Sequence, residues 1–246
     1  MSRTMAARMV TAFAALAGCS QVLGLKPAKV AEDPPDIDAA IMDDAAIDTP
    51  TAGCMPSACQ FGCDPNTNQC REAKLWIFQT ATAFLGNAFG GTDTPANVRG
   101  GADGACLLAY SPTYSARQCS NSNVHAILYV TASDSIALMA TKYNIPTTVP
   151  VYRGEDNVLV SNNWNDLTDL TKQLRAAATT ATTDADGLVW TGANPQNTCM
   201  NWTVAVSTSM GERGYADRAE AMWLAEDFFR CDRPAHLLCI CWPDNS

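Results

Sequence analysis

Apolar residues along this chain fall into short runs and helical spacings that predict a folded region over residues 71–246. Runs rich in Val, Ile, Leu and aromatic residues, bounded by Gly, Pro, Asn and Asp, predict β-strands. Ala102, Cys106 and Ala109 share one face at helical spacing, which predicts a helix over about residues 97–110. Strands are expected at residues 74–80, 124–130, 149–152, 158–160, 187–191, 200–206 and 237–242, and shorter helices at residues 136–139 and 166–178.

Strands outnumber helices in this pattern and do not alternate with them regularly. The strands at residues 149–152 and 158–160 are expected to form a hairpin that turns at residues 154–157. Ser133 or Asp134 can cap the helix that begins near residue 136. This combination favours an α+β domain with a mainly antiparallel sheet and two or three helices. A domain of this length can bury roughly 70% of the surface that its unfolded chain exposes.

The first residues have the pattern of an export signal. Arg3 and Arg8 supply positive charge, and the apolar run of residues 9–16 that follows is too short to span a bilayer. The run ends in the sequence LAGC, which resembles the lipobox of bacterial lipoproteins. The resemblance implies that residues 1–18 are a lipoprotein signal peptide and that the thiol of Cys19 carries a diacylglycerol. The alternative is an ordinary signal peptide followed by an incidental cysteine.

The same resemblance implies a location. Lipoproteins carry several acyl chains at their new N-terminus, which is enough for stable anchoring. Ser20 follows the cysteine at the position where an Asp would favour the inner membrane. The expected location is therefore the outer membrane, on its periplasmic or cell-surface side, with the membrane as a partner through the lipid anchor.

Residues 19–53 carry seven acidic residues, two lysines and no aromatic residue, and they show no sustained hydrophobic period. Such a segment cannot bury enough apolar surface to offset its ordering entropy, so we expect a lipidated, acidic, flexible tether. The formal net charge is −9, and cleavage of Arg3 and Arg8 with the signal would lower it by two to −11. A charge of this sign argues against nucleic acid as a partner.

The ten cysteines after Cys19 are most simply a disulfide set, because their number is even and an exported protein meets an oxidising compartment. Zinc is the competing interpretation, but the chain has no Cys-x-x-Cys pair and its only histidines are His125 and His236. We therefore expect no metal site and no cofactor.

Four cysteines crowd into residues 54–70, a segment too short to have a core of its own, and they predict a small disulfide knot. Residues 64–68 (DPNTN) resemble the opening of a calcium loop, but Gln69 replaces its obligatory Gly and Leu75 replaces its bidentate Glu. A turn-rich knot without metal is the expected structure, and its pairing stays open. The four cysteines are Cys54, Cys59, Cys63 and Cys70.

Four stretches of residues 71–246 share a pattern of glycines, tryptophans and cysteines. They are GGADGAC at residues 100–106, VSNNWNDL at 160–167, VWTG at 189–192 with CMNW at 199–202, and Cys231 with HLLC at 236–239. In this order they resemble the C-type lectin-like fold, and in particular the lectin-like domains of bacterial surface lipoproteins, which are structurally akin to endostatin. The resemblance implies a disulfide-stabilised lectin-like domain over residues 71–246.

The resemblance also implies a disulfide frame for the six cysteines of this domain. Two pairs belong to the family pattern, and the two cysteines left over are expected to bond each other. The pairs are Cys106–Cys239, Cys199–Cys231 and Cys119–Cys241. Cys239 and Cys241 lie two residues apart on an expected strand, so both side chains face the same way. Trp190 and Gly192 are expected in the central sheet, as a core residue and a close-packing position.

Calcium-dependent sugar binding, which some lectins of this fold carry out, is not expected here. Those lectins have an acid-Pro-amide triplet in a long loop and a Trp-Asn-Asp string shortly before the last cysteines. In this chain Trp164-Asn165-Asp166 lies ahead of Trp190, and residues 194–196 read NPQ. A calcium cage of several converging oxygen atoms cannot be assembled from these residues.

The chain has no Gly-x-Ser-x-Gly elbow, no His-Glu-x-x-His helix and no phosphate-binding loop, so an enzyme is not expected. The expected function is a binding or adhesion protein, calcium-independent, for a surface glycan or protein ligand. Trp164, Tyr215 and Trp223 are the side chains expected to make an exposed ligand contact. Two alternatives stay open: an extracytoplasmic enzyme built on the same scaffold, and a structural envelope lipoprotein without a specific ligand.

Overall fold

The computed structural model describes residues 54–64, 66–89, 94–180 and 187–244. The chain divides into two compact units, residues 1–47 and residues 48–246, and every described residue belongs to the second unit. The expected signal peptide, its lipid attachment site Cys19 and the tether lie outside the described residues.

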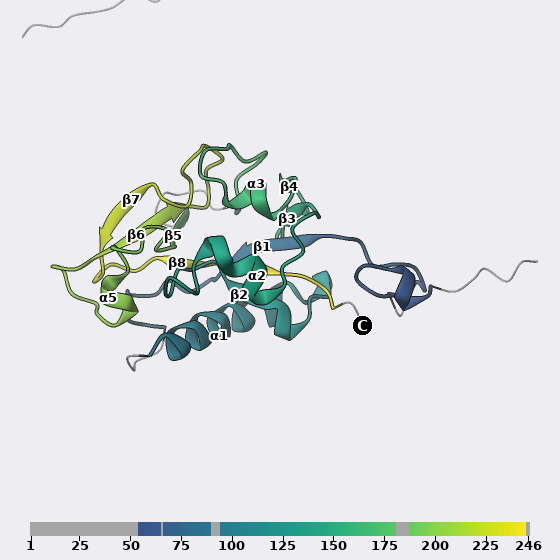
Figure 1. Ribbon diagram of the computed structural model, residues 1–246, viewed down its shortest axis with the longest axis horizontal. Coiled ribbons are helices and arrows are strands. Elements are labelled where there is room, and N and C mark those ends of the chain that lie inside the picture. Colours follow the sequence, from purple (N-terminus) through teal and green to yellow (C-terminus); the bar gives the residue numbers. More distant parts are fainter. Residues whose placement is uncertain (1–53, 65, 90–93, 181–186, 245–246) are drawn as a thin grey trace, which may run out of the picture. The chain divides into compact units, whose positions relative to one another are not determined.

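The second unit is built on one sheet, in which the strands follow the order β4-β3-β1-β8-β5-β6-β7 and β2 also pairs with β8 (Figure 1). The strands are β1 (Leu75–Gln79), β2 (Val124–Ala126), β3 (Val151–Arg153), β4 (Leu159–Ser161), β5 (Leu188–Trp190), β6 (Met210–Tyr215), β7 (Asp227–Arg230) and β8 (His236–Cys241). The α-helices of the described residues are α1 (Pro95–Thr113), α2 (Met139–Tyr143) and α3 (Trp164–Thr168), and the short turn labelled α5 (Cys199–Trp202) has positive φ angles. Short 3-10 helices are η1 (Pro56–Ala58), η2 (Ser115–Arg117), η3 (Asn121–Asn123) and η4 (Ile136–Leu138).

Most neighbouring strands in this sheet are antiparallel. The parallel pairs among the described residues are β1 with β3 and β5 with β8. The expected hairpin is present as the antiparallel pair β3 and β4. The prediction of an α+β structure with a mainly antiparallel sheet is therefore confirmed.

Strand β8 lies at the centre of the hydrogen-bonded network. One edge pairs antiparallel with β1, where Phe78 lies opposite Cys239. The other edge is shared by two strands, because β2 places Ala126 opposite Cys239 while β5 places Trp190 opposite Leu237. Three strands from distant parts of the chain are thus aligned on β8.

Strands β1 and β8 are buried on both faces. In β1 the side chains of Leu75 and Ile77 pack in one core cluster, and those of Trp76 and Phe78 pack in a second cluster. Successive side chains of a strand point to opposite faces, so the two clusters lie on opposite sides of the sheet. A strand buried on both faces has an unbroken apolar sequence, which explains the apolar runs that predicted β1 and β8.

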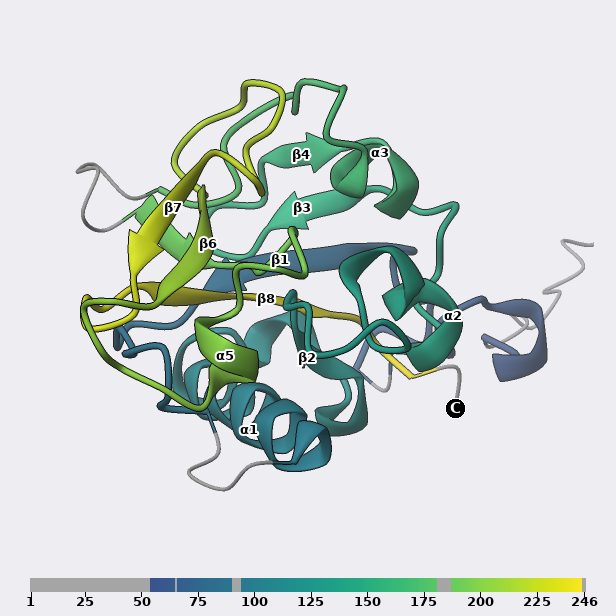
Figure 2. The same ribbon diagram turned by 60° about the vertical axis from the view of Figure 1, so that its left-hand side comes forward.

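Helix α1 covers the second of these faces and lies along one side of the sheet in both views (Figures 1 and 2). Val98, Ala102, Cys106 and Tyr110 recur at every fourth position of α1 and are all buried. They pack in the same cluster as Phe78 of β1. The predicted face of α1 is confirmed for Ala102 and Cys106.

Three disulfides of the sheet region join the pairs that the resemblance implied: Cys106–Cys239, Cys119–Cys241 and Cys199–Cys231. The first two connect β8 to α1 and to the segment that follows α1, on the face shared by Cys239 and Cys241. The Cys106–Cys239 bond joins residues 133 positions apart. In the chain-entropy model a loop of this size stabilises the fold by about 4–5 kcal/mol.

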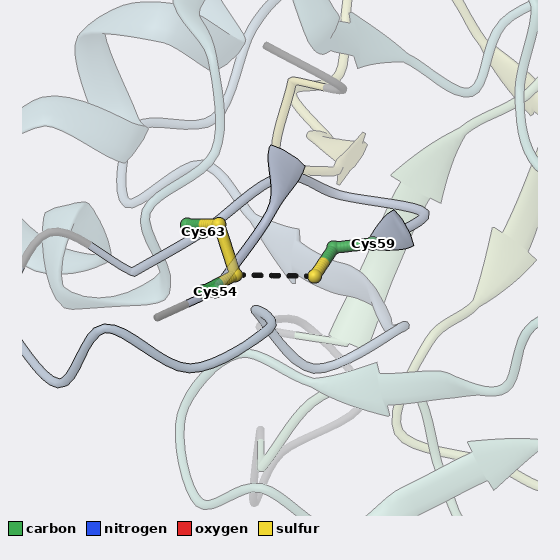
Figure 3. Close-up of side chains that lie close together, drawn as sticks. All are labelled: Cys54, Cys59 and Cys63. Atoms are coloured by element: carbon green, nitrogen blue, oxygen red, sulfur yellow. Dashed lines mark hydrogen bonds between the residues drawn. A yellow bond between two sulfur atoms is a disulfide. The ribbon is translucent and has the colours of Figure 1, made fainter. Parts of the chain in front are cut away.

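Residues 54–70 form the expected knot, with the pairs Cys54–Cys63 and Cys59–Cys70. The Sγ atoms of Cys54 and Cys59 lie 3.1 Å apart (Figure 3). Both atoms belong to disulfides and carry no proton, so this approach is a contact between two bonds and not a hydrogen bond. Phe61 is fully buried and packs in the core cluster that contains Leu75, so the knot does not depend on its disulfides alone.

The expected helix over residues 166–178 is wrong. Helix α3 ends at Thr168, and the backbone beyond it bonds to other segments, as from the N–H of Leu174 to the carbonyl of Ala219 at 2.8 Å. The expected strand over residues 124–130 is shortened to β2, although Ile127 still donates its N–H to Leu238. The sequence pattern did not predict β6 and β7.

The expected strand over residues 200–206 is also wrong. Met200, Asn201 and Trp202 have φ angles of 53°, 59° and 63°, in the left-handed region that a strand cannot contain. Trp202 is buried, and its indole N–H donates to the carbonyl of Tyr129 at 2.8 Å. Gly192 lies just beyond β5, where a Cβ would come within 2.9 Å of the Trp202 ring, so its expected role as a close-packing position is confirmed.

A buried ion-pair network holds α1 against β2 and α2. Arg99 of α1 donates from Nε and Nη2 to the two carboxylate oxygens of Asp134, at 3.0 and 2.9 Å. It also donates to the carbonyls of Ala126 and Leu128, each at 2.7 Å. Asp134 therefore does not cap the helix after it, and η4 begins without a side-chain cap.

Lys142 of α2 completes the network, with its Nζ 2.7 Å from Asp134. Burial alone would raise the pKa of Asp134, but the hydrogen bonds from Arg99 and Lys142 outweigh burial and hold that pKa below its ordinary value. The carboxylate is thus ionised in the folded protein at neutral pH.

We expect Asp134→Asn to lower the free energy of unfolding by about 3 kcal/mol, because it leaves the buried Arg99 with the more distant Asp103, at 3.4 Å, as its compensating charge. Since the pKa of Asp134 is lowered on folding, the stabilisation is fully present above about pH 4 and is lost as the pH falls through the lowered pKa. Denaturant unfolding measures the difference in the free energy of unfolding between wild type and variant. Asp232→Asn is the matched control, because Asp232 makes an exposed ion pair with Arg230 at 2.7 Å and should contribute little. Equal losses in the two variants would contradict this account.

Candidate functional site

The structure places two of the three expected contact residues in the core. Trp164 and Trp223 are each 1% exposed, and the indole N–H of Trp223 donates to the carbonyl of Leu167 at 3.2 Å. The prediction that they make an exposed ligand contact is therefore wrong, because their apolar area is used for packing. Tyr215 is half-buried, and the Arg218 guanidinium lies 3.8 Å from its ring centre.

The candidate site is a groove of about 1090 Å³ beside α1. Such a volume is slightly above the usual range for ligand pockets, which ends at about 1,000 Å³. One wall is a face of α1, and the other is formed by the end of β1 with the residues after it, the β3–β4 turn, residues 179–180 and the first residue of β8. The lining residues are Gln79, Thr80, Ala81, Thr82, Phe84, Gly101, Gly104, Ala105, Leu108, Ala109, Pro112, Thr113, Tyr114, Glu155, Thr179, Thr180 and His236.

The α1 wall is one helical face built from small residues. Its members follow the spacing of three and four residues that marks a single face, and they include Gly104, Ala105 and Leu108. A Cβ on Gly104 would meet no atom within 4 Å, so packing does not require a glycine there. Leu108 is 78% exposed, so this wall also presents apolar surface.

The opposite wall is polar and rigidly held. Thr80 is 2% exposed, donates its hydroxyl to the carbonyl of Thr82 at 2.8 Å and accepts from the N–H of Leu237 at 3.0 Å. The Nδ1 of His236 lies 2.6 Å from the carbonyl of Thr80. A carbonyl can only accept, so Nδ1 carries the proton, and Nε2 has the free lone pair in the neutral ring.

Glu155 is positioned by the β3–β4 turn. The N–H of Gly154 donates to Ile77 at 2.7 Å, and the Arg117 guanidinium donates to the carbonyl of Gly154 at 3.0 and 2.7 Å. These bonds fix the turn against β1 and against the segment after α1. The Tyr114 hydroxyl then donates to Oε1 of Glu155 at 3.2 Å.

Burial raises the pKa of Glu155 above its ordinary value. Burial, and then the neighbouring Glu155, also raise the pKa of the Tyr114 hydroxyl, which stays a proton donor. Two buried oxygens of the groove, Oε2 of Glu155 and Oγ1 of Thr179, have no hydrogen-bond partner within the described part of the chain. Unsatisfied buried oxygens are unfavourable by about 1–3 kcal/mol each, and a ligand donor would relieve them.

The groove is not suited to a metal ion, because Glu155 is the one carboxylate among its lining residues. Within the described ranges, the Cys, His, Asp and Glu side chains grouped closely enough for a metal are Cys54, Cys59 and Cys63 (Figure 3). Metals bind the thiolate form of cysteine, whereas these three sulfur atoms are in disulfides.

Sequence reasoning did not find the groove. Glu155 lies in an expected turn, where a charged residue usually faces solvent, and His236 has no second histidine or cysteine at the spacing of a metal site. The available signal was the presence of glycines inside a predicted helix, at positions 100 and 104, because glycine weakens helices and neither is required by packing. Gly101 of the same helix has a packing reason, since a Cβ there would lie 1.5 Å from the carbonyl oxygen of Phe89.

No protein-family model and no curated protein matches this chain. None of the helices in the described ranges is long and apolar enough to cross a membrane. The function of the groove is therefore argued from its own residues.

We expect Glu155→Gln to stabilise the fold at neutral pH. The raised pKa means that the ionised carboxylate is disfavoured in the folded protein, so wild type loses stability as the pH rises through that pKa. The amide of the variant would be neutral at every pH and keep an oxygen for the Tyr114 hydroxyl. Thermal unfolding across pH measures this: the variant should have the higher melting temperature at neutral pH, and the gain should vanish below the ordinary pKa of Glu, about 4.3. A variant less stable than wild type at neutral pH would contradict the assignment.

Proposed function

We propose that this chain is a lipid-anchored binding protein of the outer membrane that takes a surface glycan in the groove beside α1, without calcium and without catalysis. The groove itself carries the proposal, because one wall is apolar and the other presents hydroxyl, imidazole and carboxyl groups. Sugars combine C–H faces, which pack on apolar side chains, with hydroxyl groups that donate and accept hydrogen bonds. A concave site of this kind suits an oligosaccharide better than the flat face of a protein.

The polar groups of the groove support binding without calcium. Calcium takes about six to eight oxygen ligands, of which several are usually carboxylates. Glu155 is the one carboxylate that lines this groove. The glycan would therefore be held by direct hydrogen bonds and by packing.

The rest of the proposal concerns the scaffold. The pairing of Cys106 with Cys239 and of Cys199 with Cys231 supports a C-type lectin-like domain, since that family implied both bonds. In the proposal Cys19 carries the lipid, and residues 19–53 hold the domain away from the membrane. Of the contact residues expected from the sequence, Tyr215 remains a candidate for a secondary contact.

The groove also favours a second candidate, an extracytoplasmic enzyme on the same scaffold. Glu155 has a raised pKa and His236 has a fixed ring orientation, and acid–base catalysis uses groups of this kind. This candidate ranks second because most glycoside hydrolases need two carboxylates across the scissile bond, and the groove has one.

We expect Gly104→Leu to weaken glycan binding at least about tenfold, because the new side chain would fill the apolar wall of the groove. Gly100→Leu is the matched control. Gly100 lies in α1 with no atom within 4 Å of an added Cβ, and it does not line the groove. Both variants should be at least as stable as wild type, since leucine favours a helix over glycine by about 0.8 kcal/mol.

A glycan array probed with the full chain in detergent, with and without EDTA, is the measurement. Wild type and Gly100→Leu should bind the same glycans, Gly104→Leu should lose them, and EDTA should change nothing. Binding that survives in Gly104→Leu would overturn the groove as the site, and loss with EDTA would overturn calcium independence. Cleavage of a bound glycan, detected by mass spectrometry, would favour the enzyme instead.

A further inference from the structure

We infer that the groove selects glycans that carry free amino groups, and that Glu155 and Thr179 receive one such ammonium group. The inference rests on the proposed function, because it names the chemistry of the ligand that the same groove takes. It starts from the charges and the unsatisfied oxygens of the lining residues.

The groove is electrostatically suited to a cation. Its lining residues include the carboxyl group of Glu155 and neither lysine nor arginine. The imidazole of His236 is the remaining basic group, and its Nδ1 is already bonded to the carbonyl of Thr80. The formal net charge of the chain is −9, so its long-range field also attracts positive ligands.

The hydrogen-bond capacity of the polar wall points to a ligand that donates. Oε1 of Glu155 accepts from Tyr114 at 3.2 Å, whereas Oε2 has no partner within the described part of the chain. Thr179 is 2% exposed, and its Oγ1 is equally without a partner there. An ammonium group has three donors and no acceptor, so it complements oxygens that lack a donor. Both residues line the groove.

The shape of the groove favours an amino sugar over a lysine side chain. The small residues Gly104 and Ala105 leave room for a ring against α1, and the Phe84 and Tyr114 rings also line the site. A linear alkylammonium chain would leave most of the volume of about 1090 Å³ unfilled.

The test compares three β-1,4-linked hexasaccharides of the same length: glucosamine, N-acetylglucosamine and glucose. Isothermal titration calorimetry with the full chain in detergent, at neutral pH and physiological salt, gives the three affinities. We expect wild type to bind the glucosamine oligomer about tenfold or more tightly than either of the others, because hydrogen bonds to charged groups are the stronger ones. Salt at this level screens the attraction of distant charges.

Two variants separate the site from general charge attraction. Glu155→Gln should reduce the preference for glucosamine to about twofold or less while the fold stays stable. Asp156→Asn removes the same charge one residue away. The Asp156 carboxylate is exposed, is paired with Arg153 and does not line the groove, so this variant should keep the preference for glucosamine.

Equal affinities for the three hexasaccharides in wild type would overturn the inference, and so would a preference that survives in Glu155→Gln. Binding of none of the three would overturn it as well. In each case the proposed function stands if the array still detects a glycan whose binding Gly104→Leu abolishes, and it fails with the inference if no such glycan is found.

Discussion

The burial of β8 is the constraint on which the rest of the structure depends. This strand is hydrogen-bonded along both edges, to β1 on one side and to β2 and β5 on the other. Its side chains are also buried on both faces, so every neighbouring element is placed relative to it. The Cys106–Cys239 bond fastens the middle of α1 to the strand, and the Arg99–Asp134 pair holds α1 near its N-terminus. One wall of the groove is thereby fixed against β8, whose first residue, His236, belongs to the opposite wall.

The groove gathers features that are locally unfavourable. Gly104 weakens the helix that carries it, although packing does not require a glycine there. Glu155 is buried with a raised pKa, and one oxygen each of Glu155 and Thr179 lacks a partner within the described part of the chain. Departures of this kind from the most stable choice are expected at functional sites, where they remain because a ligand uses them. Their presence together in one concave site is the physical basis for assigning binding to it.

The sequence predicted the parts of the fold that depend on local pattern. The buried strands β1 and β8 and the helix α1 have long apolar runs or clear spacing, and the alternation along β8 placed Cys239 and Cys241 on one face. The expected helix over residues 166–178 failed because its backbone bonds to distant segments, and the expected strand over residues 200–206 failed because left-handed residues place Trp202 in the core. Trp164 and Trp223 were assigned to a surface because burial cannot be read from residue type alone. The groove was missed because its walls come from five separate segments, which only the folded chain brings together.

Hydrogen–deuterium exchange of the full chain, with and without the glucosamine hexasaccharide, tests directly whether this groove is where a glycan binds. Ligand binding slows exchange where it restrains the backbone or stabilises local structure. The account predicts slower exchange in the segments that line the groove, at residues 79–84, 101–114, 155, 179–180 and 236, and unchanged exchange in β7 on the far edge of the sheet. Slowing confined to β6, β7 or the knot over residues 54–70, with the groove segments unchanged, would contradict it.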